Sequence, residues 1–131
     1  MFLVVRGFEH LWLDRLRIAL PADPTVALAL AACGNALGSN IVNNVPMTLL
    51  SLSLIARAAG PAREAMAYGA LVGANIGPTL TTFGSLATML WLTLIRRRGL
   101  DVSAIEYMKV ALLTTPAVLA AATAALWLAL R

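Results

Sequence analysis

Two short polar runs interrupt an otherwise apolar chain, and they hold the residues best suited to bind a solute. They cover residues 38–46 and 73–82, and each combines Asn, Gly and Pro with hydroxyl side chains. Amides and hydroxyls both donate and accept hydrogen bonds, whereas Gly and Pro break helices and free backbone groups. Such a set could hold a neutral polyol-like solute, an anion, or a cation on carbonyl oxygens. Neither run contains a carboxylate, so neither encodes a direct Asp or Glu proton relay.

The position of these runs within the chain indicates what they do. Each is flanked by roughly 10–15 mostly apolar residues, which is too few to cross a bilayer as a helix. Inside a membrane, such breaks persist only where they are buried in protein or line a wet cavity. Paired interrupted segments are a good pointer to the binding site of a transporter. The alternative is that the polar residues only cap and join half-helices.

Composition places the chain in a membrane. It is 60% hydrophobic and 12% charged, against about 25% charged residues in soluble domains. Between residues 25 and 95 the charged residues are Arg57, Arg63 and Glu64, and residues 110–130 carry none. The net charge of +4 comes from basic residues at segment ends, where they set topology, so it does not predict a nucleic-acid partner. We expect an all-α, multi-pass protein of the plasma (inner) membrane, in contact with the lipid bilayer.

Metal, disulfide and cofactor chemistry has no basis in the sequence. One Cys and one His supply neither a disulfide nor a metal constellation, and no cofactor motif is present. The thiol of Cys33 would suit a thiophilic solute such as arsenic(III). Because it lies among small apolar residues, we favour a packing role for it.

The first part of the chain divides at Pro21 and Pro24. Residues 1–25 are expected to hold the end of a truncated helix and an amphipathic interfacial segment. The apolar start suggests a C-terminal fragment, a split gene or a wrong start codon. Residues 26–56 are expected to form a re-entrant hairpin of two half-helices around the first polar run. One continuous helix over the same residues is the alternative, which the Asn, Gly and Pro residues disfavour.

After a loop at 57–64, the second part is expected to cross the membrane twice. Residues 65–95 predict a transmembrane helix broken at 75–82, with Gly69 and Gly73 forming a close-packing face. Three consecutive Arg residues at 96–98 indicate the cytoplasmic side. Residues 100–109 predict a cytoplasmic surface helix, and 110–130 an uninterrupted transmembrane helix that leaves on the outer side.

Both polar runs, read together, resemble a known family. The sequences GSNIVNNVP at 38–46 and GANIGPTLTTFGSLATMLW at 73–91 are similar to the C-terminal half of the arsenical pump membrane proteins, within the ion transporter superfamily. The resemblance runs through nearly all 131 residues. It implies the second inverted repeat of a proton-coupled carrier that exports arsenite or antimonite. The first repeat would have to come from another chain or a further copy of this one.

The resemblance also implies which residues form the solute site. One side would be the hairpin tip, with Ser39, Asn40, Asn43, Asn44 and Pro46. The facing side would be the unwound helix, with Asn75, Gly77, Pro78, Thr79, Thr82, Gly84 and Ser85.

Two other functions stay open at this point. The same fold could carry an anion or dicarboxylate with sodium or protons. The chain could also be a non-transporting membrane fragment, in which Asn43 and Asn75 would be dispensable. An enzyme has little support, because the sequence offers no nucleophile–base pair and no phosphate-binding loop.

Overall fold

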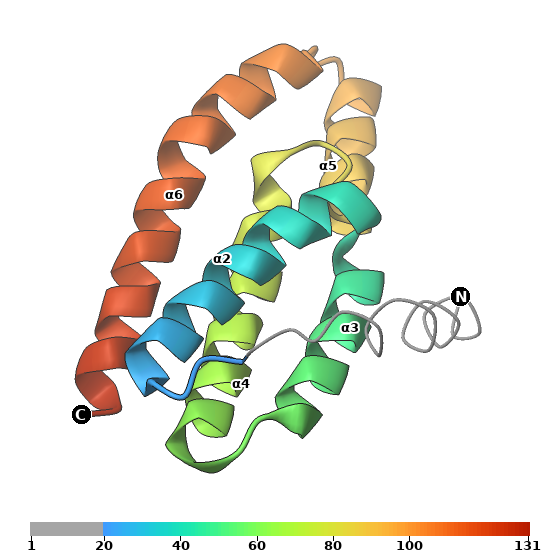
Figure 1. Ribbon diagram of the computed structural model, residues 1–131. Helices are drawn as coiled ribbons and strands as arrows, with labels where there is room; N and C mark the ends of the chain where they lie inside the picture. The colour runs from blue at the N-terminus through green and yellow to red at the C-terminus, as the bar shows by residue number, and fades with distance from the viewer. Residues whose placement is uncertain (1–19) are drawn as a thin grey trace.

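The computed structural model describes residues 20–131. The truncated helix end and most of the interfacial segment, expected within residues 1–25, therefore lie outside the described residues. The described part is all-α, as predicted: its elements are helices joined by short non-helical segments, with no strand among them. Its elements in chain order are α2 (Pro24–Val42), α3 (Asn44–Arg57), α4 (Gly60–Ile76), the short 3₁₀ helix η2 (Gly77–Leu80), α5 (Leu86–Arg97) and α6 (Ala104–Ala129) (Figure 1).

Helices α2 and α3 form an antiparallel hairpin that turns at Asn43 (Figure 1). Near the turn, Gly38 lies against Met47. At the open end, Leu54 and Ile55 of α3 pack against a buried cluster formed by the first turns of α2 and α4. The turn lies short of the end of the molecule at which α5 leads into α6. Helices α2 and α3 therefore form a helical hairpin where one was expected, at 26–56. Its re-entrant placement in a bilayer is part of the proposal below.

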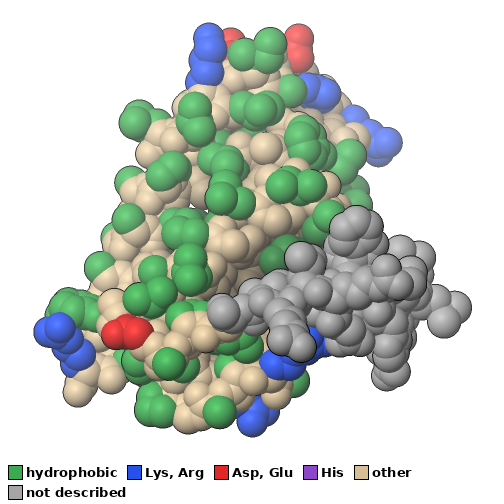
Figure 2. Space-filling model, in the orientation of Figure 1, with side chains coloured by type: hydrophobic (Ala, Val, Ile, Leu, Met, Phe, Trp, Pro, Cys, Tyr) green, Lys and Arg blue, Asp and Glu red, His purple; other side chains and the backbone are tan. Residues whose placement is uncertain are grey.

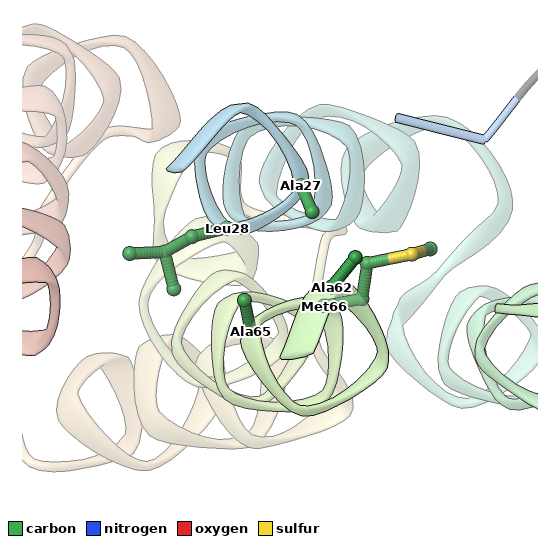
Figure 3. Packing of buried hydrophobic residues seen from close by; sticks show 5 residues of the cluster. All are labelled: Ala27, Leu28, Ala62, Ala65 and Met66. Carbon is green, nitrogen blue, oxygen red and sulfur yellow. The ribbon is translucent and has the colours of Figure 1, made fainter. Parts of the chain in front are cut away.

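The core lies between α2 and α4, which run parallel. Its centre is a cluster of small and apolar side chains (Figure 3), namely Ala27, Leu28, Ala62, Ala65 and Met66. Further along the same interface, Gly73 meets the carbonyl of Ala32 and Gly77 meets the Cα atom of Ala36. A Cβ atom on either glycine would overlap that backbone, so small residues set the separation of the helices. The close-packing face predicted at Gly69 and Gly73 thus continues into η2.

Helix α6 is one continuous element of 26 residues. At 1.5 Å per residue it is about 39 Å long, which exceeds the roughly 30 Å hydrocarbon core of a bilayer. We expected two elements here, at 100–109 and 110–130. They are joined because a capping box between Ser103 and Glu106 starts the helix, and no residue breaks it afterwards. Pro116 is accommodated within it.

Two of the described helices, α2 and α6, are long and apolar enough to cross a membrane. At one end of the molecule, the indole N–H of Trp127 donates to the hydroxyl of Thr25 and ties the end of α6 to the start of α2. On the face shown in Figure 2, the charged side chains lie towards the two ends, with hydrophobic side chains between them. This distribution suits a protein embedded in lipid.

The helix ends differ from the predicted ones for local reasons. Helix α2 continues through 38–42, although we expected the first polar run to interrupt it, and the side chains of Ser39 and Asn40 both donate to the carbonyl of Ala36 within the helix. The predicted loop at 57–64 shrinks to 58–59, since Pro61 lies in the first turn of α4, where proline is tolerated. Helix α4 extends through Ile76, and α5 begins only at Leu86.

Candidate functional site

Asn40 joins the two polar runs, and its side chain uses all of its hydrogen-bonding capacity to do so. The amide nitrogen donates to the carbonyls of Ala36 at 2.7 Å and Gly77 at 2.8 Å. The amide oxygen accepts from the backbone N–H of Thr81 at 3.0 Å and from its hydroxyl at 2.7 Å. An Asn side chain has two donor hydrogens and one acceptor oxygen with two lone pairs. Asn40 therefore clamps the second run against α2.

The hairpin turn at Asn43 is the first break in helical structure. Asn43 has φ 74°, and among the described residues it is the one non-glycine residue with a positive φ. Its ψ of 158° places Asn43 outside the left-handed helical region, in a backbone conformation that glycine adopts far more readily than other residues. Its half-buried amide forms no hydrogen bond within the described part of the chain. The amide oxygen of Asn44 accepts from Thr48 at 3.4 Å, and Pro46 lies in the first turn of α3.

Ser39 does not present its hydroxyl to an open site. The side chain is 0% exposed, and its Oγ donates to the carbonyl of Ala36 at 3.0 Å. It is a small buried residue of α2 rather than part of the turn.

The second break covers η2 and the residues up to Ser85. Gly77, Pro78 and Gly84 are buried. A Cβ atom on Gly84 would lie 2.5 Å from both the amide oxygen of Asn40 and the carbonyl oxygen of Pro78. The break is thus folded tightly around the Asn40 side chain, which explains why glycine occurs at this position.

On its other side the second break is held by α6. The hydroxyl of Thr79 donates to the carbonyl of Ile76 at 2.6 Å and lies 3.1 Å from the hydroxyl of Thr115. The hydroxyl of Tyr107 donates to the carbonyl of Thr79 at 2.8 Å. The ring of Tyr107 also packs against Trp91 of α5, with centroids 6.1 Å apart.

Three of the predicted site residues lie apart from the Asn40 clamp. Asn75 is exposed on α4 and donates to the carbonyl of Leu71 in its own helix. Ser85 caps α5 by accepting from the N–H of Ala87. Thr82 is half-buried, and its hydroxyl forms no hydrogen bond within residues 20–131.

Several polar residues that sequence reasoning did not select also hold the breaks in place. Asn35 and Ser51 form a buried hydrogen bond of 2.8 Å between α2 and α3, and Thr115 is 6% exposed. Each is a polar residue inside an apolar stretch, which is the signal that could have identified it. Tyr107 gave no such signal.

Asn and Thr side chains give the two breaks neutral polar groups. Within residues 20–131, the amide of Asn43 and the hydroxyl of Thr82 form no hydrogen bond, and Asn44 uses only its amide oxygen, whereas the amide of Asn40 is fully used. Cys33 is exposed and lines an apolar groove between α2 and α6 with Pro116, and a smaller groove that also contains Ala36 and Gly77. Amide and hydroxyl groups of this kind can hydrogen-bond to small uncharged solutes.

Two helix breaks joined through a side-chain amide, together with two helices long and apolar enough to span a bilayer, are typical of a helical membrane protein. The sequence profile of the family described as arsenical pump membrane protein matches residues 20–130. The chain therefore belongs to the arsenical pump membrane protein family.

Individual relatives agree with this assignment. An arsenical pump membrane protein of Yersinia enterocolitica is 33% identical over 137 aligned positions. One from Escherichia coli is 34% identical over the same length, and both alignments cover 99% of this chain and 32% of the relative. A putative arsenical pump membrane protein of Bacillus subtilis is 27% identical over 88% of this chain and 28% of its own length. The chain thus spans about a third of the relatives it matches. No solved structure matches it.

Proposed function

We propose that this chain is the C-terminal part of a proton-coupled carrier that exports arsenite or antimonite, with the solute held between the two breaks. The observation that carries the proposal is the Asn40 clamp, because it brings the hairpin tip and the second break together. The relatives are named as arsenical pumps. Arsenite at neutral pH is largely a neutral trihydroxide, which amide and hydroxyl partners can bind without a counter-charge.

The proposed placement is that of a carrier with a re-entrant hairpin in the plasma (inner) membrane. In this arrangement α2 and α3 enter and leave on one side, while α4 and α5 form a broken crossing. The Arg residues at 96–98 face the cytoplasm, following the preference of basic residues for that side. The hairpin turn at Asn43 then lies within the membrane, where freed backbone groups can contact a solute.

The proposal includes a second set of helices. Alternating access requires two sides that move around one solute, and this chain supplies one hairpin and one broken helix. The complement would be an N-terminal repeat on another chain or a second copy of this one.

The test uses the Escherichia coli relative. The third of that protein that matches this chain is replaced by this chain, and everted vesicles are made from cells lacking their own pump. We expect energised vesicles to accumulate arsenite and a protonophore to stop it. The relative with its own segment is the positive control.

Two outcomes of the transport assay would count against arsenite export. A chimera that is present in the membrane at the parent's level but moves no arsenite would overturn the proposal. Sodium-dependent uptake of an anion or dicarboxylate instead would support the alternative carrier.

A further inference from the structure

Tyr107 contacts the second break and α5 at the same time. Its hydroxyl donates to the carbonyl of Thr79, which belongs to η2. Its ring packs against Trp91, near the middle of α5. All three residues line one groove of about 350 Å³ between α5 and α6. Tyr107 is thus a bridge between three elements that are separated by up to 28 positions in the chain.

Apart from Trp91, α5 packs only lightly against the other described helices. In the described part of the chain, α5 makes few contacts with other elements, whereas α2, α4 and η2 pack closely together. Of its residues, only Thr88 and Leu92 are buried. The Trp91–Tyr107 contact is therefore a main link between α5 and the remainder of the bundle.

The carbonyl of Thr79 needs a donor. It lies at the end of a 3₁₀ turn that is followed by extended chain at Thr81, so the α-helical donor four residues later is lost. A carbonyl at membrane depth without a partner is costly. The Tyr107 hydroxyl supplies that partner from α6.

We infer that Tyr107 is a positioning residue for the proposed transport, which fixes the second break through the Thr79 carbonyl and links it to α5 through Trp91. It holds the break from α6, whereas the Asn40 clamp holds it from α2. The inference rests on the proposed function, because it assumes that the second break is part of the solute site.

The first experiment asks whether the hydroxyl of Tyr107 positions the break, without measuring transport. Thr82 is replaced by Cys in a Cys33→Ala background, and its labelling rate by a small maleimide is followed in membranes. We expect Tyr107→Phe to change this rate by about threefold or more, consistent with loss of one hydrogen bond. Tyr68→Phe is the matched control, because Tyr68 is exposed and makes no hydrogen bond in the described part. Equal rates in the two variants would overturn the inference.

The second experiment separates positioning from general stability. In the chimeric carrier, Tyr107→Phe is expected to raise the arsenite concentration for half-maximal flux by about three- to tenfold, with the amount of protein in the membrane unchanged. Tyr68→Phe should leave it unchanged. A variant that lowers only the amount of protein, with the same half-saturation, contradicts the inference. If the wild-type chimera moves no arsenite, the proposed function fails while the labelling experiment still decides the role of Tyr107.

Discussion

Asn40 and Thr81 lie 41 positions apart in the chain, yet two hydrogen bonds join the amide oxygen of Asn40 to the backbone N–H and the hydroxyl of Thr81. The other half of the same amide holds the Gly77 carbonyl. One side chain thus satisfies a donor and an acceptor that the broken helix would otherwise leave unpaired.

Replacing Asn40 by Asp should strongly destabilise the fold. The acceptor oxygen for Thr81 remains, but the second carboxylate oxygen would face the carbonyls of Ala36 and Gly77, which are also acceptors. We expect a loss of about 3 kcal/mol or more, measured as a lower melting temperature in detergent. Asn75→Asp is the control, because Asn75 donates only to its own helix. Equal losses for both variants would contradict the clamp.

Gly77→Ala should separate the second break from α2. The added Cβ atom would overlap the Cα atom of Ala36, and such overpacking typically costs about 1–3 kcal/mol. Gly34→Ala is the matched substitution, since no atom lies within 4 Å of its Cβ position. That variant should be neutral or up to about 1 kcal/mol more stable. Thermal unfolding of the two purified variants measures the difference, and a stable Gly77→Ala protein would argue against the close approach.

The buried pair Asn35 and Ser51 should couple α2 to α3. A double-mutant cycle with Asn35→Leu and Ser51→Ala isolates the 2.8 Å bond between them. Hydrogen bonds between membrane helices average about 0.6 kcal/mol, with a maximum of about 1.7. We expect a coupling energy in this range from denaturant unfolding. A cycle with no coupling would mean that the two side chains contribute independently.

Asn43→Gly tests the proposed solute contact without straining the turn. Glycine accepts the φ of 74°, so the hairpin should form while the free amide is lost. We expect arsenite flux through the chimeric carrier to fall by about tenfold, the order of one lost hydrogen bond to a bound solute. Unchanged flux would favour a turn-forming role for Asn43 and would remove it from the solute site.

Sequence reasoning predicted the helical membrane fold and the breaks more readily than the details of the site. The apolar stretches and the Asn, Gly and Pro residues indicated where helices would be interrupted, and Gly69 and Gly73 indicated a close interface. The polar tip predicted at 38–46 is smaller in the structure, because α2 continues to Val42 and α3 begins at Asn44, which leaves Asn43 as the turn.

The roles of individual residues were harder to predict, because they depend on contacts between distant parts of the chain. Nothing near Asn40 in the sequence shows that Gly77 and Thr81 take up the hydrogen-bonding capacity that Ala36 leaves on its amide. Tyr107 belonged to a predicted surface helix, and only the continuous α6 brings it to Thr79. These long-range hydrogen bonds determine which of the proposed solute-binding side chains remain available to a solute.

The long span of the Asn40 clamp also bears on the order of assembly during synthesis. The partners at Gly77 and Thr81 leave the ribosome about 40 residues after Asn40, so when the hairpin of α2 and α3 is made, the Asn40 amide has only the carbonyl of Ala36 as a partner. Until α4 and η2 arrive, that amide needs water or another temporary donor and acceptor. The hairpin is therefore expected to enter the bilayer together with α4, as one cooperative insertion step.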